Sequence, residues 1–304
     1  MDIELKENYE IRNLTSFKVG GIVKKIYFPK TQAEFLQVIR AEKDSIVLGS
    51  CSNIIFSSSG CDDTIICTSK MNNIEIRGTK IIAECGTKGP LLAQKAHEAK
   101  LSGFEFMIGF PGSIGGNIFM NAGAHNQSVS DTLTLVCLYD KEKDEIVYLT
   151  KSEMDFGYRH SIVQDNKYIV LGAEFDLKRD DSDVIKSLMT RNLEFRKNIQ
   201  PPLTYPNAGS VFRNPEHDSA GRLLDKAGVK TLDFPNVAVW QKHANFIVNK
   251  GNATSEDILE LMYTMYKKVK DTYTIELMPE IRFIGKMNKR EEEICQELYK
   301  KIQK

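Results

Sequence analysis

Residues 22–49 read IVKKIYFPKTQAEFLQVIRAEKDSIVLG, and this stretch alternates strand-like and helix-like segments. We predict strands over Ile22–Phe28 and Ser45–Gly49, with a helix between them. Thr31 and Glu34 form a capping box at the start of that helix, in which each side chain satisfies a backbone N–H that the first turn leaves without a partner. The order strand, helix, strand predicts a βαβ unit at the start of the fold.

After this unit the pattern changes to short strands of antiparallel type. The predicted strands cover residues 64–68, 74–77, 80–85, 132–140, 145–149 and 167–177. Two helices are expected among them, one with Pro90 in its first turn and running to Lys100, the other from about Ser182 to Asn198. A βαβ start that gives way to antiparallel strands indicates an α+β fold.

Three prolines, Pro201, Pro202 and Pro206, fall within six residues. Proline fixes its own φ and disfavours helix in the residue before it, so we predict a linker and a domain boundary near residue 200. The elements expected beyond it are a strand over 208–213, a helix ended by Gly228, strands over 237–240 and 245–249, a helix over 254–270 and a strand over 274–284.

The C-terminal tail, residues 286–304, carries Ile294, Leu298 and Ile302 at intervals of four residues. This narrow apolar stripe on a charged helix is typical of a surface helix that docks on the body of the protein. We prefer that interpretation to a site for a partner.

The composition excludes several classes of protein. Among 304 residues, 41 are basic and 41 acidic, which gives a formal net charge of +0 with 41% hydrophobic residues. A nucleic-acid-binding domain needs an excess of basic charge, and a disordered chain has low hydrophobicity and a large net charge. At about 150 residues per domain, the length predicts roughly two domains.

The N-terminal residues alternate charged and apolar side chains, unlike a signal peptide, and no apolar stretch is long enough for a membrane span. We therefore expect a cytoplasmic protein without membrane insertion. The six cysteines show no C-x-x-C pair and the five histidines no metal-ligand spacing, so we expect reduced thiols and no metal.

Glycines gather in one part of the chain. Six of the 20 glycines lie between residues 103 and 123, around the core GFPGSIGGN of residues 109–117. Glycine lets a ligand approach the backbone, and successive amides can hold phosphate oxygens. The spacing fits neither a P-loop nor a Rossmann fingerprint. A second small-residue turn, GSCSN of residues 49–53, would supply amides for the second phosphate of a pyrophosphate, although tight backbone packing explains such turns as well.

Polar residues are dense in three further segments, residues 156–161, 206–215 and 279–282. None of them contains the G-x-S-x-G elbow of a serine hydrolase. From the residues alone, Arg159 and Glu280 fit an ordinary ion pair as well as a site, and Ser210 fits a turn hydroxyl.

The order of these motifs over residues 11–285 resembles the UDP-N-acetylenolpyruvoylglucosamine reductase family. The motifs are NLTSFKVGG (13–21), GSCSN (49–53), the run of residues 109–124, YRHS (158–161), NAGSVF (207–212), KHANF (242–246) and PEIRF (279–283). The resemblance implies a flavoprotein of peptidoglycan synthesis with an FAD-binding fold of the vanillyl-alcohol-oxidase/PCMH type. It implies FAD-binding subdomains over 1–70 and 71–199, an α+β domain for the UDP-sugar over 200–285, and a helical tail over 286–304.

The resemblance also implies the site residues. Arg159, Ser210 and Glu280 are expected to be catalytic, and Tyr158, Arg213 and Asn214 to bind the UDP-sugar. The residues expected on FAD are Gly49, Ser50, Ser52, Asn53, Gly112, Ser113, Gly115, Gly116 and Asn121.

The chemistry agrees with this set. Hydride addition to the β-carbon of an enolpyruvyl ether moves negative charge into the adjacent carboxylate, which calls for a fixed cation and a hydrogen-bonding acid. Arg159 supplies the first, since a guanidinium binds a carboxylate bidentately, and Glu280 supplies the second. The α-carbon then needs a proton, and Ser210 is the expected donor.

Spacing narrows the type of family member. Ser210 follows Arg159 by 51 residues (210 − 159), as in the shorter form of the family that lacks an extra loop with a substrate-clamping tyrosine. Two stretches depart from the family pattern. Cys51 stands where glycine is usual, which puts the geometry of that loop in question, and residues 231–240 replace a glycine-rich turn.

The leading hypothesis is an FAD enzyme that uses NADPH to make UDP-N-acetylmuramate and acts as a monomer without a nucleic-acid partner. A second reading is a sugar or alcohol oxidase of the same FAD fold, which would not explain Ser210 together with Glu280. A third is a non-enzymatic FAD-binding relative, against which the presence of all three catalytic residues speaks.

Overall fold

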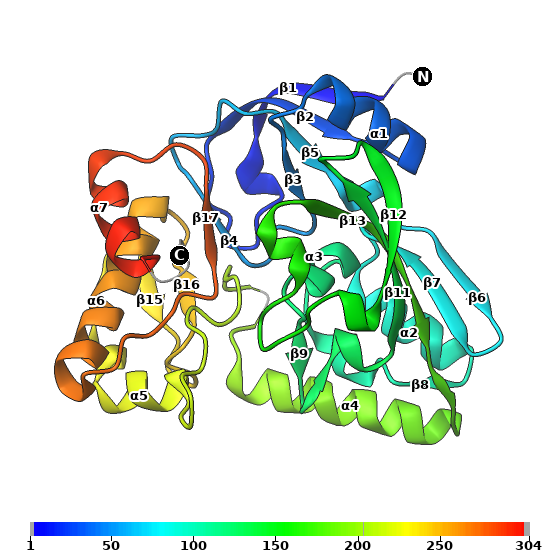
Figure 1. Ribbon diagram of the computed structural model, residues 1–304. Helices are drawn as coiled ribbons and strands as arrows, with labels where there is room; N and C mark the ends of the chain where they lie inside the picture. The colour runs from blue at the N-terminus through cyan, green and yellow to red at the C-terminus, as the bar shows by residue number, and fades with distance from the viewer. Residues whose placement is uncertain (1–2, 203, 301–304) are drawn as a thin grey trace. The chain divides into compact units, whose positions relative to one another are not determined.

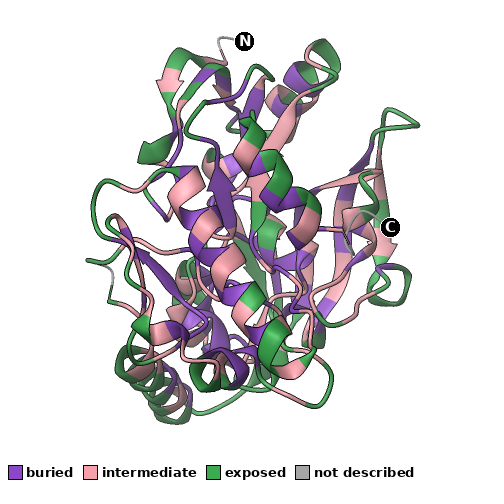
Figure 2. Cartoon of the chain, turned by 90° about the vertical axis from the view of Figure 1, so that its left-hand side faces the viewer, coloured by how far each residue is buried: buried purple, intermediate pink, exposed green. Residues whose placement is uncertain are grey.

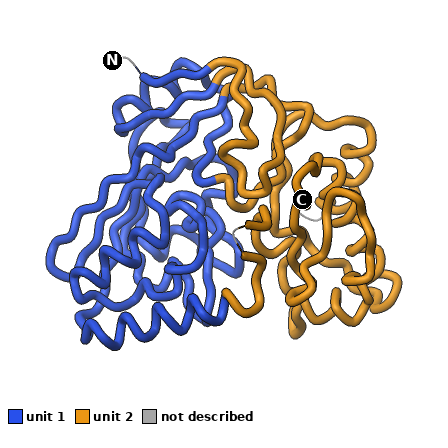
Figure 3. The backbone as a smooth tube through the Cα atoms, turned by 180° about the vertical axis from the view of Figure 1, so that it is seen from behind, with its two compact units in different colours: residues 1–6, 26–50, 65–196 blue, residues 7–25, 51–64, 197–304 orange. Residues whose placement is uncertain are grey.

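The computed structural model describes residues 3–202 and 204–300, and the chain segments form two units (Figures 1 and 3). The first unit consists of Met1–Lys6, Ile26–Ser50 and Ile65–Arg196. The second consists of Glu7–Lys25, Cys51–Thr64 and Lys197–Lys304. Both units are therefore assembled from segments that are far apart in the sequence.

The predicted βαβ start is present. Strand β2 (Ile22–Phe28) is followed by α1 (Gln32–Ala41) and β3 (Ile46–Leu48), and β2 and β3 each pair in parallel with β5 (Ile65–Cys67). With β1 (Glu4–Glu10) the sheet has the order β1-β2-β5-β3. Thr31 caps α1 by accepting from the Glu34 amide, while the Glu34 carboxylate accepts from the Lys30 amide, one residue earlier than the capping box predicts.

The antiparallel part of the fold is a second sheet in the first unit. Its order is β12-β11-β13-β7-β6, and every neighbouring pair is antiparallel. The strands are β6 (Ile74–Arg77), β7 (Lys80–Glu84), β11 (Leu133–Asp140), β12 (Glu145–Thr150) and β13 (Tyr168–Asp176). Parallel and antiparallel sheets in one chain confirm the α+β prediction.

Helices and short strands complete the first unit. They are α2 (Gly89–Glu98), α3 (Ile114–Phe119), α4 (Ser182–Ile199), the pair β8 (Leu101–Ser102) with β14 (Lys178–Arg179), and the pair β9 (Gly123–Ala124) with β10 (Gln127–Ser128). Its core contains Phe35, Phe104, Phe106 and Phe175, all buried. In Figure 2 buried and exposed residues alternate along the helices, because each helix buries one face.

The second unit carries α5 (Ala220–Lys226), α6 (Ser255–Tyr273) and α7 (Lys289–Leu298). Strand β4 (Ile54–Phe56) pairs in parallel with β17 (Arg282–Ile284), and β15 (Val237–Val239) pairs antiparallel with β16 (Ile247–Asn249). Single 3₁₀ turns lie at Ile11–Asn13, Thr68–Lys70, Glu105–Gly109, Val129–Asp131, Lys151–Glu153, Ile162–Asp165 and Val229–Thr231.

Two predicted strands are wrong in extent. Residues 208–213 form only single bridges, Ser210 with Phe246 and Phe212 with Pro279, because this segment exchanges neighbours every two residues. The strand predicted over 274–284 is reduced to β17. Thr274 has a φ of 58° and ends α6 in a left-handed cap, so an extended ladder does not begin there.

The tail forms α7, and Ile294 and Leu298 are buried as the stripe predicts, whereas Ile302 lies outside the described residues. None of the six cysteines forms a disulfide. Over residues 3–202 and 204–300, no helix combines the length and apolar character that a membrane span requires. The same residues contain no group of three or more His, Cys, Asp and Glu side chains placed to hold a metal.

Candidate active site

The glycine-rich loop before α3 packs against the Gly49 turn inside the first unit. A Cβ on Gly49 would lie 2.2 Å from Oγ of Ser113, and a Cβ on Gly112 would lie 2.1 Å from Oδ1 of Asn117. Both distances are far below those of real Cβ contacts, so a side chain at either position would have to displace Ser113 or Asn117. The two turns that the sequence predicts as phosphate cradles are therefore neighbours.

Main-chain hydrogen bonds join the glycine-rich segment to residues 85–89. The amide of Ile114 donates to Thr87 O at 2.8 Å, and the amide of Gly115 donates to Cys85 O at 2.8 Å. The Gly112 carbonyl accepts from the Gly89 amide at 3.0 Å. The loop conformation is thus set by backbone contacts with β7 and α2.

Two buried polar atoms in the loop test whether a cofactor fits here. Ser113 is 1% exposed and Asn117 is 3% exposed. Oγ of Ser113 and Nδ2 of Asn117 have no hydrogen-bond partner among the described residues. Buried polar atoms in folded proteins nearly always have one, so the residues present fit a polar group of FAD at this place. Their position beside Gly49 and Gly112 agrees with the predicted cofactor loops.

Arg159 lies on a strained loop in the same unit. Its φ is 56°, in the left-handed region that side chains rarely adopt. Its guanidinium lies 5.2 Å from the centre of the Tyr158 ring, a cation–π arrangement, and the Tyr158 side chain is 57% exposed. Such strain persists only where the surroundings determine the conformation.

Neighbouring side chains hold the Arg159 loop in this strained conformation. Nε2 of Gln164 donates to Arg159 O at 2.9 Å and to Phe119 O, at the end of α3, at 2.8 Å. Oγ of Ser161 also donates to Phe119 O, at 2.9 Å. The loop with Arg159 is therefore tied to the helix that follows the glycine-rich loop.

Asn121 belongs to this tie. Its Nδ2 donates to Gly157 O at 3.0 Å, and its Oδ1 accepts from the Ser130 amide at 3.3 Å. The residue was predicted on FAD, and in the structure both ends of its amide bond to the protein. Asn121 thus connects the glycine-rich segment to the Arg159 loop.

In the second unit, the segments with Ser210 and Glu280 are hydrogen-bonded to each other. The Glu280 amide donates to Val211 O at 2.8 Å, and the Arg213 amide donates to Met278 O at 2.8 Å. Ser210 and Glu280, which are 70 positions apart (280 − 210), are therefore brought together. Arg159 belongs to the first unit.

Asn245, which is 3% exposed, fixes the Ser210 segment. Its Oδ1 accepts from the Phe212 amide at 2.9 Å and its Nδ2 donates to Phe212 O at 2.8 Å. Its own carbonyl accepts from the Val211 amide at 2.9 Å. The Asn245 side chain thus makes the two hydrogen bonds to Phe212 that a neighbouring strand would otherwise make.

Asn53, predicted on FAD, bonds to the Glu280 segment. Its Nδ2 donates to Glu280 O at 3.1 Å, and its carbonyl accepts from the Arg282 amide at 3.1 Å. Two residues earlier, Cys51 has a φ of 50°, the backbone conformation that glycine favours. Cysteine at this position therefore keeps the backbone conformation that glycine would adopt, and its left-handed φ is strained.

Of the three residues predicted to bind the UDP-sugar, Arg213 and Asn214 lie in the second unit, and Asn214 also bonds to the protein. Oδ1 of Asn214 accepts from the Ala220 amide at 3.0 Å, at the start of α5. Desolvation lowers the pKa of Arg282, and the positive charge of Arg213 lowers it further. The positive charges of Arg213 and Arg282 therefore oppose each other.

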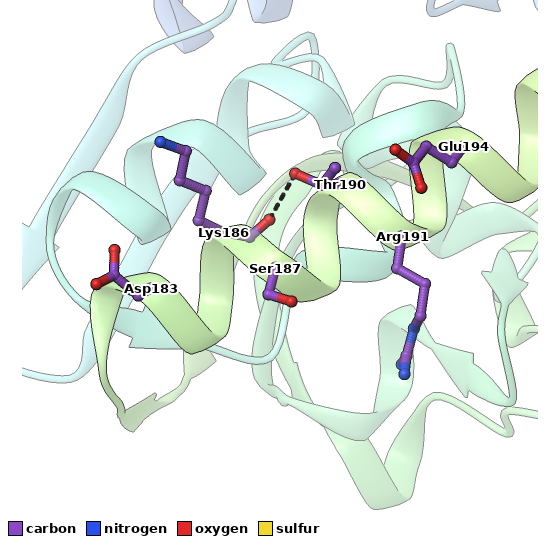
Figure 4. A pocket seen from close by; sticks show the side chains of 6 residues that line it. All are labelled: Asp183, Lys186, Ser187, Thr190, Arg191 and Glu194. Atoms are coloured by element: carbon purple, nitrogen blue, oxygen red, sulfur yellow. Dashed lines mark hydrogen bonds between the residues drawn. The ribbon is translucent and has the colours of Figure 1, made fainter.

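A hollow of about 390 Å³ lies elsewhere, on α4 (Figure 4). Its walls are Asp183, Lys186, Ser187, Thr190, Arg191 and Glu194, all side chains of one helix. None of the predicted site residues lines it, so it is not part of the candidate active site.

A UDP-N-acetylenolpyruvoylglucosamine reductase of Caldicellulosiruptor bescii is 38% identical over 289 residues, which are 93% of this chain and 91% of the relative. The chain belongs to this reductase family. The reductase of Clostridium novyi is 37% identical over 93% of this chain and 92% of its own length.

Family models and a solved structure agree. Residues 23–146 match an FAD binding domain and residues 200–284 the C-terminal domain of UDP-N-acetylenolpyruvoylglucosamine reductase. The crystal structure of the reductase from Thermus caldophilus superimposes with a TM-score of 0.79 at 29% identity, covering 93% of this chain and 99% of that one. The predicted resemblance and the predicted FAD-binding fold are confirmed.

Sequence reasoning missed the residues that hold the site in place. Asn117, Gln164 and Asn245 were not singled out for any role. Asn117 and Asn245 lie inside quoted motifs, so a polar residue among buried neighbours was a usable signal. Gln164 lies outside every motif, and only the fold reveals its contact with Arg159.

Proposed function

We propose that Arg159, Ser210 and Glu280 are the residues with which this chain carries out the reaction of its family. The reaction itself follows from family membership. The chain is an oxidoreductase that reduces the enolpyruvyl ether of UDP-N-acetylglucosamine enolpyruvate to UDP-N-acetylmuramate in peptidoglycan precursor synthesis. FAD is its cofactor and NADPH its reductant.

When bound, FAD supplies hydride transfer from NADPH to the β-carbon of the enolpyruvyl group. Arg159 binds the substrate carboxylate and stabilises the negative charge that reaches it. Glu280 hydrogen-bonds the same carboxylate, and Ser210 delivers a proton to the α-carbon. These roles require one cation and two hydrogen-bonding groups for a single reacting carboxylate.

The observation that carries the proposal is the hydrogen bond between the Glu280 amide and Val211 O, next to Ser210. It supports a shared site because it sets the spacing of the two residues through main-chain atoms. The strained φ of Arg159, held by Gln164, supports a positioned cation.

A serine variant tests the proton donor. In single-turnover experiments the FAD-loaded Ser210→Ala protein should be bleached by NADPH at the normal rate. Reoxidation by UDP-N-acetylglucosamine enolpyruvate should fall by about 10²- to 10⁴-fold, the usual contribution of a positioned general acid. Near-normal reoxidation would remove Ser210 from the mechanism. Ser187→Ala, exposed on α4, is the matched control and should leave both steps unchanged.

The oxidase hypothesis has a separate outcome in the same experiment. If the bleached wild-type protein regains its colour only when oxygen is admitted, and not with the sugar nucleotide, the chain is an oxidase. If NADPH causes no bleaching, the non-enzymatic alternative stands.

The cofactor contacts are part of the proposal. We place FAD along Gly49, Ser50, Ser52, Asn53, Gly112, Ser113, Gly115, Gly116 and Asn121, and the UDP-sugar beside Tyr158, Arg213 and Asn214. The support is the close packing of Gly49 and Gly112 against Ser113 and Asn117, together with the buried polar atoms of these two side chains. Ser113→Ala should weaken FAD retention on dialysis without unfolding the protein, and unchanged retention would contradict the placement.

Broader assignments accompany this proposal. We expect two FAD-binding subdomains over 1–70 and 71–199, a sugar domain over 200–285, a cytoplasmic location, and a monomer with no nucleic-acid partner. Sedimentation velocity gives the oligomeric state, and a dimer at micromolar concentration would contradict the last of these expectations.

A further inference from the structure

The C-terminal helix α7 lies beyond residue 284, where the match to the family's C-terminal domain ends. It is nevertheless firmly docked within the second unit. Glu291 is 1% exposed, and its carboxylate accepts from Oγ of Ser255 at 2.5 Å and from the Asn288 amide at 3.0 Å. Ile294 and Leu298 are buried on the same face. These contacts fix the position of α7, and with it the position of the residue that follows the helix.

Tyr299 follows this helix and reaches the Glu280 segment. Its hydroxyl donates to the main-chain carbonyl of Ile281 at 2.7 Å, and its side chain is only 9% exposed. Burial raises the pKa of Tyr299 well above the usual value for a tyrosine, so the hydroxyl keeps its proton and remains a donor.

Ile281 is the point where the segment changes neighbours. Before it, Pro279 bridges Phe212, and the Glu280 amide donates to Val211 O. After it, Arg282 begins the parallel pairing of β17 with β4. The Ile281 carbonyl lies between the two pairings, and Tyr299 supplies its hydrogen bond.

The peptide groups around Glu280 are thus held from three directions. Val211 O accepts from its amide, Nδ2 of Asn53 donates to its carbonyl, and Tyr299 donates to the next carbonyl. The bonds from Val211 and Asn53 hold the two peptide planes on either side of the Glu280 Cα, which set the backbone dihedrals that aim its side chain. The Tyr299 bond holds the next plane, between Ile281 and Arg282, and so limits how far the Glu280 planes can turn. A small rotation there would displace the carboxylate, and misplacement of a reacting group by about 1 Å can slow a reaction by about 10²-fold.

We infer that Tyr299 is a positioning residue for Glu280, so that the C-terminal helix belongs to the catalytic apparatus. The inference rests on the proposed role of Glu280. A purely structural role for the tail predicts instead that loss of the hydroxyl lowers stability and leaves the reaction of the folded enzyme unchanged.

Tyr266 offers a matched control. It is 2% exposed, and its hydroxyl lies 3.2 Å from Oε1 of Glu297, so it also joins α6 to α7 through one tyrosine hydroxyl. Within the part of the chain that the structure describes, its hydroxyl bonds to α7 and not to the Glu280 segment. Tyr266→Phe and Tyr299→Phe each remove one buried hydroxyl and keep the ring, but only Tyr299→Phe removes a bond to the Glu280 segment.

The experiment compares FAD-loaded Tyr299→Phe, Tyr266→Phe and Glu280→Gln with the wild-type enzyme. Tyr299→Phe should slow reoxidation by UDP-N-acetylglucosamine enolpyruvate by about tenfold while bleaching by NADPH stays within about twofold of normal. Its substrate KM should change less than its kcat, because the defect lies in the reacting geometry. Tyr266→Phe should leave both steps unchanged, and thermal melting should show comparable stability losses for the two.

The outcomes separate the two proposals. Normal reoxidation in Glu280→Gln would overturn the proposed role of Glu280. Slow reoxidation in Glu280→Gln combined with normal reoxidation in Tyr299→Phe would overturn the positioning role alone. Equal slowing in Tyr299→Phe and Tyr266→Phe would overturn it too, since the effect would then come from stability.

If Tyr299→Phe does not retain FAD, a second variant still tests the inference. Leu298→Ala leaves a cavity under α7 and loosens the helix without removing the hydroxyl. Slower reoxidation with normal bleaching in this variant supports the inference, and a normal rate in both steps overturns it.

Discussion

Arg159 and Glu280 are held in place by different means. The Arg159 loop has a strained backbone and depends on side chains, above all Gln164, which donates to Arg159 O and Phe119 O. The Glu280 segment is held mainly by main-chain bonds to Val211 and β4. A loop that depends on single side chains is open to disruption by one substitution, whereas a main-chain ladder resists it. The following predictions test this difference.

The largest effect is expected for Arg159 itself. Arg159→Ala removes the cation for the substrate carboxylate, and reoxidation by the sugar nucleotide should slow by about 10²- to 10³-fold. Arg159→Lys should recover only part of the rate, because lysine does not bind a carboxylate bidentately. Stopped-flow absorbance measures both. Arg77→Ala, an exposed arginine on β6, should behave as wild type, and equal loss there would contradict a specific role.

Asn245 supports the Ser210 segment, which pairs with the Glu280 segment, through its side chain. Asn245→Ala leaves the amide and carbonyl of Phe212 buried without their partner, which should lower the free energy of unfolding by about 2–4 kcal/mol. Urea denaturation followed by circular dichroism gives this value. Asn72→Ala, at an exposed position, should change it by less than about 0.5 kcal/mol. A loss of less than about 1 kcal/mol for Asn245→Ala would show that the main-chain ladder suffices alone.

Gln164 tests the dependence of the Arg159 loop on a single anchor. Gln164→Ala should lower the free energy of unfolding by about 1–2 kcal/mol and slow reoxidation about tenfold, because Arg159 loses its fixed position. Gln37→Ala, exposed on α1, is the control. Unchanged kinetics would mean that Asn121 and Ser161 hold the loop without Gln164.

The smallest effect is expected at Cys51. Cys51→Gly relieves a left-handed backbone, worth about 1 kcal/mol, but gives up a small buried side chain and adds chain entropy to the unfolded state. The net change should stay within about 1 kcal/mol. Cys61→Gly is the matched control, since Cys61 is also buried and lacks the positive φ, and it should be destabilised by about 2 kcal/mol. A similar loss in both variants would contradict the strain argument.

The sequence predicted local elements well and long-range pairing poorly. Ile22–Phe28 and Ile74–Arg77 are strands with the expected bounds, because alternation and turn residues are local signals. Strand β4 was not predicted, since Ile54–Phe56 is a short apolar run that becomes a strand only beside β17. The strand predicted over residues 208–213 was wrong for a related reason, because the Asn245 side chain bonds to Phe212 where a neighbouring strand would.

The same distinction between local and long-range signals applies to the candidate site. Motifs predicted the glycine-rich turns and the residues proposed as catalytic, because the resemblance to the family rests on those motifs. The supports, Gln164 and Tyr299, bond to main-chain carbonyls. Any residue offers a carbonyl, so no sequence pattern marks the partner.

The parallel pairing of β4 with β17 joins Ile54 to Arg282, positions 228 residues apart (282 − 54). The ribosome synthesises the chain from its N-terminus, so Ile54–Phe56 cannot pair with its partner strand until almost the whole protein has been made. The first unit needs no residue beyond Arg196. Non-local pairings form slowly, and the nascent chain is therefore expected to expose the apolar strand Ile54–Phe56 for most of translation. A chaperone that captures short apolar segments would find its binding site there.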